Sequence, residues 1–95
     1  MNAMHTYSYL IEIFNDPEAT EAAATVAAVG HVPSEEELIT WPSAASPALS
    51  NAIVSDVNHR INSSGYSLPV VTVIVPTELK GSELLQALGF APGTN

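Results

Sequence analysis

The sequence LPVVTVIV at residues 68–75 carries the strongest indication of the fold. Residues 70–75 are apolar at nearly every position rather than at alternate positions, and their β-branched side chains favour extended backbone. A strand that is apolar on both sides is typical of the centre of a sheet, where both faces are covered. Pro76 follows directly and ends the run. The sequence therefore predicts a central strand over 68–75.

A second strand is predicted over residues 5–14 (HTYSYLIEIF), in which aromatic and aliphatic side chains alternate with a mixed set. Glu12 falls in the mixed set, and the first 59 residues contain no Lys or Arg to pair with it. We therefore expect Glu12 to reach solvent from an edge strand. Residues 38–41 either end a helical turn or form a short third strand.

Three helices are predicted. Asp16 and Pro17 form a cap followed by proline, and the Ala-rich stretch after them indicates a helix over 17–29. Ser46 and Pro47 repeat the signal before a helix over 47–63. Its apolar side chains recur every four residues, which gives one stripe. A last helix is predicted over 82–88, ended by Gly89. The stripe of the second helix consists of Leu49, Ile53, Val57 and Ile61.

These elements predict an α+β fold in a single domain spanning residues 1–95, with residues 91–95 as a frayed tail. The sheet would have two or three strands, packed with the three helices. Two strands alone are marginal in water. Either the segment 38–41 completes the sheet or a second chain does so.

Charge is distributed unevenly along the chain. Ten acidic residues face only two bases, Arg60 and Lys80, for a net charge of −8. Eight of the acids precede Arg60, so the first 59 residues carry the whole net charge. A chain this poor in Lys and Arg cannot neutralise phosphates, which argues against direct nucleic-acid binding. The same charge favours contact with a basic protein surface.

The chain has no cysteine, no recognisable signal peptide and no apolar run near the ~20 residues of a membrane span. We expect a cytoplasmic protein that does not contact membranes. The three histidines, His5, His31 and His59, lie in separate predicted elements, and only His59 has an acidic neighbour at helical spacing. No metal site or cofactor is predicted. No serine lies in a nucleophile-elbow pattern, so no enzymatic activity is predicted either.

Two features are candidates for partner binding. The first is the set of acids at predicted helix starts, among which Ser34 and Glu37 match a capping box. The second is Trp41, because tryptophan is enriched at interface anchors and this one adjoins a proline. The candidate partner-binding residues are Glu18, Glu21, Glu35, Glu36, Glu37 and Trp41.

The sequence thus favours a small acidic protein-binding module that docks on a basic surface of a larger protein. Inhibitors, immunity proteins and accessory factors have this profile, and phage-encoded anti-defence proteins share it. The alternative is a structural subunit of a homo-oligomeric assembly. That alternative rests on the low charge of the second half of the chain, because interface cores are depleted in charge.

Overall fold

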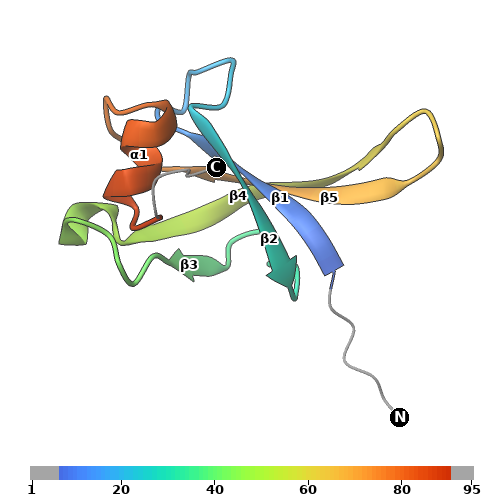
Figure 1. The fold of residues 1–95 in the computed structure, drawn as a ribbon, viewed down its shortest axis with the longest axis horizontal. Coiled ribbons are helices and arrows are strands. Elements are labelled where there is room, and N and C mark those ends of the chain that lie inside the picture. The colour runs from blue at the N-terminus through green and yellow to red at the C-terminus, as the bar shows by residue number, and fades with distance from the viewer. Residues whose placement is uncertain (1–6, 91–95) are drawn as a thin grey trace, which may run out of the picture.

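The computed structural model describes residues 7–90, which form a five-stranded mixed sheet with one α-helix and one short 3₁₀ helix (Figure 1). The strand order across the sheet is β2-β1-β5-β4-β3. β1 and β5 run parallel, and the other neighbours are antiparallel. The elements are β1 (Tyr7–Phe14), β2 (Ala24–Gly30), β3 (Leu38–Thr40), η1 (Pro47–Leu49), β4 (Asn51–Ile61), β5 (Ser67–Ile74) and α1 (Gly81–Ala87).

The sheet is curled into a half-barrel, and the chain connectivity shows why. β2 and β3 lie at opposite edges, yet only residues 31–37, called here the bridging segment, join them. The eight Cα-to-Cα steps from Gly30 to Leu38 span at most about 29 Å when fully extended, and less here because residues 35 and 36 form a turn. Crossing a flat five-stranded sheet takes roughly 19 Å, and clearing the side-chain layer at both ends adds about 10 Å. Curling brings the two edges within reach.

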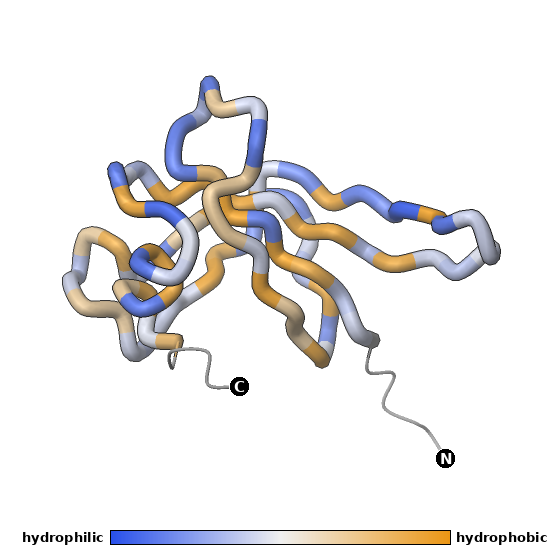
Figure 2. Tube along the Cα trace, turned by 45° about the horizontal axis from the view of Figure 1, so that its top comes forward, coloured by the Kyte–Doolittle hydropathy of each residue, from blue (hydrophilic) through white to orange (hydrophobic). Residues whose placement is uncertain are grey.

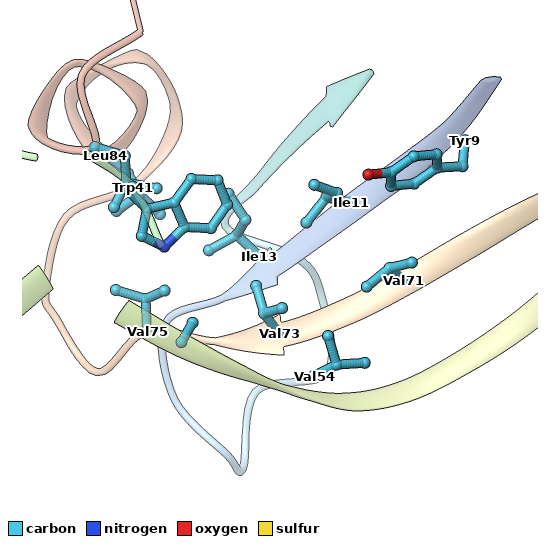
Figure 3. Packing of buried hydrophobic residues seen from close by; sticks show 11 residues of the cluster. Tyr9, Ile11, Ile13, Trp41, Val54, Val71, Val73, Val75 and Leu84 are labelled. Carbon is cyan, nitrogen blue, oxygen red and sulfur yellow. The ribbon is translucent and has the colours of Figure 1, made fainter. Parts of the chain in front are cut away.

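The core fills one end of the concave inner face. Ile13, Val73 and Val54 lie side by side across β1, β5 and β4, and all three are buried. Figure 3 shows Trp41 between Leu84 of α1 and the side chains of this face. The main buried cluster comprises Tyr9, Ile11, Ile13, Trp41, Ala52, Val54, Val71, Val73, Val75, Leu84 and Leu88.

Close backbone contacts fix α1 over this core. The Gly81 N–H donates to the carbonyl of Ala23 at 2.8 Å, and the Ala45 N–H donates to the carbonyl of Ala87 at 2.7 Å. Gly89 ends the helix with φ +100°, and a Cβ at this position would lie 2.5 Å from that of Ser43. Only glycine meets both conditions. The helix is therefore held tightly against the loop that follows Trp41.

An ion pair crosses the convex outer face. The two terminal nitrogens of Arg60 donate to the two carboxylate oxygens of Glu12, each at 2.9 Å. Hydrogen bonding to Glu12, and then the attraction of its charge, raise the pKa of the Arg60 guanidinium. In the strand register the pair passes diagonally over Val70, which is only 1% exposed. Glu12 lies in an internal strand, so the prediction of an edge position is wrong.

The predicted helix over 17–29 is wrong, although its start signal is real. The Glu18 N–H donates to the Asp16 carboxylate at 2.8 Å, as a cap should, but the chain then forms a loop and β2. Within β2, burial alternates from residue to residue. Pairing with β1 along seven positions outweighs the helix propensity of alanine.

The predicted helix over 47–63 is also wrong. Only Pro47–Leu49 is helical, as one 3₁₀ turn, and Asn51–Ile61 is β4. A β-bulge between Val54 and Asp56 shifts the register against β5. The inner-face residues Ala52, Val54 and Val57 are therefore spaced by two and then three positions, which breaks the strict alternation expected of a strand. Ile53 and Ile61 of the predicted stripe are exposed.

The protein is therefore mainly β, and the predicted α+β class with a two- or three-stranded sheet is wrong. Other predicted elements agree with the structure. Residues 68–75 match β5, which is the central strand, 38–41 matches β3, and 82–88 matches α1 within one residue. The first predicted strand is β1 within the described residues, whereas positions 5, 6 and 91–95 lie outside them. One chain supplies all five strands, so the sheet needs no second chain for completion.

Ile13→Ala should lower the free energy of unfolding by about 2–5 kcal/mol, because Ile13 is fully buried at the centre of the core. Val29→Ala is the matched control, since Val29 is 74% exposed and should change stability by less than about 1 kcal/mol. Urea denaturation of both variants measures the difference. Equal losses would contradict the placement of Ile13.

Glu12→Gln should lower the thermal midpoint at low salt, because it removes the carboxylate that Arg60 contacts. The loss should shrink as NaCl approaches about 0.5 M, since half-exposed ion pairs are screened. Glu78→Gln is the control for the change in net charge, because Glu78 has no ion-pair partner within residues 7–90. If the thermal midpoints of Glu12→Gln and Glu78→Gln fall equally and depend equally on NaCl, the result would argue against the Glu12–Arg60 ion pair.

Candidate functional site

The part of the inner face that α1 does not cover forms a groove of about 810 Å³. The bridging segment forms one wall, and the β4–β5 hairpin, which projects from the body in Figures 1 and 2, forms the other. Apolar atoms form most of the lining surface, to which two imidazoles and one carboxylate also contribute. The lining residues are His31, Val32, Pro33, Ser34, Glu35, Val57, His59, Ser67 and Pro69.

The acidic part of the bridging segment has a fixed backbone. The Glu36 N–H donates to the Val54 carbonyl at 2.8 Å, and the Val54 N–H donates to the Glu37 carbonyl at 2.9 Å. The Glu37 carboxylate also accepts the N–H of Ser34, as the capping-box pattern predicts. This contact closes a turn rather than a helix. The segment is thus tied to β4 just before the bulge.

Glu36 adopts φ +72°, the left-handed region in which L residues other than glycine are disfavoured. Glycine would adopt this conformation at lower cost. Such backbone strain is concentrated at functional sites in proteins. Glu36 therefore places an exposed carboxylate at a position where glycine would give a more stable fold.

The structure divides the predicted acidic residues into two groups. Glu35, Glu36 and Glu37 are exposed on the bridging segment, and Glu35 lines the groove. Glu18 and Glu21 are exposed on the connection that precedes β2. Glu36 and Glu37 are hydrogen-bonded to Val54, so the first group lies beside β4, whereas the second lies on the connection between β1 and β2.

Trp41 lies in the core rather than on the surface. Its side chain is 6% exposed, and its ring meets that of Phe90 edge-on with centroids 5.9 Å apart. The indole Nε1 has no hydrogen-bond partner among residues 7–90. Contact with a partner would require this side chain to leave the core, and it stays a prediction.

His31, which follows β2, and His59, which lies in β4, both line the groove. Among the described residues, Glu35 is the only carboxylate in the lining. Among the described residues, no three His, Asp or Glu side chains are grouped closely enough to hold a metal ion. His5 lies outside the described residues.

The groove can bury apolar groups, and its charged margin is acidic. No Lys or Arg lines it. Of the two bases in the chain, Arg60 is engaged by Glu12 on the outer face, and Lys80 adjoins the start of α1. An apolar surface beside exposed carboxylates suits a ligand with apolar contacts and positive charge.

The chain matches no known protein-family model, and comparisons with curated proteins and with solved structures find no similar protein. Within residues 7–90, no helix has the length and apolar character needed to cross a membrane.

Sequence reasoning found the acids but missed the groove. The sequence predicts Val57 in a helical stripe and Pro69 in a strand, and nothing local to either residue indicates that both line a groove with Val32 and Pro33. Only the curling of the sheet brings these residues together. The available signal was the shortness of the bridging segment, which becomes informative once the strand order is known.

Glu36→Gly should raise the free energy of unfolding by up to about 1 kcal/mol, because relief of the left-handed strain exceeds the entropy that glycine adds to the unfolded chain. Glu36→Ala removes the same charge but keeps the strain, so it should give no such gain. Urea denaturation compares the two variants. Equal stabilities would show that charge, not backbone conformation, dominates at this position.

Proposed function

We propose that this protein is a non-enzymatic protein-binding module that docks on a basic surface of a larger protein. The bridging segment and the groove beside it form the contact surface. The observation that carries the proposal is the pair of exposed carboxylates, Glu35 and Glu36, held on a fixed backbone at the margin of an apolar groove.

A fixed backbone favours binding because less conformational freedom is lost on association. The hydrogen bonds between Val54 and residues 36 and 37 position the acids before any partner arrives. An apolar centre with a charged margin is also the usual composition of a protein interface. The groove supplies area for burial, and the acids supply orientation.

The net charge supports the same partner class. A charge of −8 on 95 residues attracts a basic surface over long range and raises the rate of association. It also opposes binding to nucleic acids. Inhibitor, immunity and accessory proteins work through such surfaces, and a phage-encoded anti-defence protein would do the same. We place this function in the cytoplasm, in keeping with a chain that has no cysteine.

Glu35→Gln/Glu36→Gln should weaken retention of the partner, because it removes two charges without changing the size of the side chains. Affinity purification from the source organism, with the protein as bait, should retain a basic protein that is released as salt rises. The double variant should retain clearly less of it. Glu37 is left unchanged because its carboxylate accepts the Ser34 N–H.

Glu78→Gln/Glu83→Gln is the matched control, since both residues are exposed and lie outside the groove and the bridging segment. It changes the net charge by the same amount. If both double variants lose the partner equally, net charge rather than the position of Glu35 and Glu36 would explain the binding. Unchanged retention in the Glu35/Glu36 variant would remove the bridging segment from the proposal.

A further inference from the structure

The groove has a direction, because part of its lining follows two paired strands out along the β4–β5 hairpin. His59 of β4 pairs with Pro69 of β5, and both residues line the groove. The next pair on the same face is Ile61 with Ser67, of which Ser67 also lines the groove. Ile61 is 69% exposed. The groove therefore ends beside an isoleucine side chain that is largely uncovered.

The opposite end of the groove carries a carboxylate. Glu35 lines the groove from a turn that Val54 holds through backbone hydrogen bonds with Glu36 and Glu37. Val54 belongs to the buried core and precedes Val57, the first groove residue of β4, by three positions. The groove is therefore acidic at the end nearest the core and apolar at the end nearest the hairpin tip.

Within residues 7–90, no base pairs with Glu35. Both terminal nitrogens of Arg60 donate to the carboxylate of Glu12 on the outer face, each at 2.9 Å. Lys80 adjoins the start of α1 and does not line the groove. A second copy of the chain would bring only the same two bases, of which one is already engaged. A cation that meets Glu35 is therefore better supplied by a different protein.

We propose that the groove binds an extended segment of the partner protein that has Lys or Arg at one end and apolar side chains two and four positions further along. The basic side chain meets Glu35, and the last apolar side chain contacts Ile61. Charge complementarity selects the basic end. The inference rests on the proposed function and specifies which part of the basic partner enters the groove.

The dimensions of the groove suit such a segment. Alternate side chains of an extended chain share one face, so residues two and four positions apart all point into the groove. Four residues of extended chain span about 13 Å, which is also the length of β4 from Val57 to Ile61. A volume of about 810 Å³ lies in the upper part of the range for sites that enclose a drug-sized molecule. Several residues therefore fill it better than one basic side chain.

The probes are two short peptides with blocked ends, Lys-Ser-Val-Ser-Val and its reverse, which together allow either chain direction. At millimolar concentration at least one of them should shift the amide NMR signals of Val57, His59 and Ile61. Replacing the lysine by glutamate should abolish binding. Replacing both valines by serine should weaken binding at least about tenfold, because apolar contact is lost.

Two variants of the protein test the two ends of the groove separately. Glu35→Gln should weaken the lysine peptide about threefold, but not a peptide with glutamine in place of lysine. Ile61→Ser should weaken the lysine peptide, but not a peptide in which the valine farthest from lysine is serine. Glu78→Gln and Ile53→Ser are the matched controls, since both residues are exposed and lie outside the groove.

Three results would overturn the inference. The first is the absence of shifts at groove residues with either peptide. The second is a glutamate peptide that binds as well as the lysine peptide, or an Ile61→Ser variant that weakens every peptide equally. The third is a concentration-dependent dimer whose groove signals shift on dilution, which would make a second copy the occupant.

The experiments also separate this inference from the proposed function. If partner retention falls in Glu35→Gln/Glu36→Gln but not in Ile61→Ser, and neither peptide binds, the extended segment is overturned and the acidic contact surface stands. If partner retention is insensitive to Glu35→Gln/Glu36→Gln while the lysine peptide binds with the expected dependence on Glu35 and Ile61, the proposed function fails and the groove remains a peptide-binding site.

Discussion

The length of the bridging segment constrains the rest of this structure. Seven residues join the two outermost strands of a five-stranded sheet, so the sheet must curl. Curling gives a concave face that one short helix and Trp41 can fill at one end only. The other end remains a groove whose wall is the bridging segment itself. The contact surface proposed here therefore follows from the connectivity that shapes the sheet.

The sequence predicts the central strand well because burial on both faces leaves an uninterrupted apolar run at 68–75. It fails at β4 because one bulge breaks the alternation of inner-face residues, while the exposed Ile53 and Ile61 complete a four-residue apolar repeat with Val57 that is typical of a helix. It fails at β2 because alanine favours helices in isolation, whereas pairing with β1 is decided by residues distant in the sequence. Both errors arise because a local stretch of sequence does not show which distant strand it pairs with.

The candidate site was predictable in its charge but not in its shape. Acidic residues without bases nearby are evident from composition, and the Ser34–Glu37 contact follows from a local pattern. The burial of Trp41 depends on α1, which begins forty residues later in the chain. The proline next to Trp41 therefore does not indicate whether its side chain is buried. The pairing of Glu12 with Arg60 across an intervening strand likewise has no local signal.

The parallel contact between β1 and β5 has a consequence for how the chain is made. Leu10 lies beside Val70, and Phe14 lies beside Ile74, so among the five described strands the earliest in the chain is a neighbour of the latest. Until β5 emerges, β1 has only β2 beside it, and an isolated hairpin is marginally stable. Non-local pairing of this kind slows folding and prolongs exposure of strand edges. Ile11 and Ile13 can therefore reach their full burial only after β5 has been synthesised.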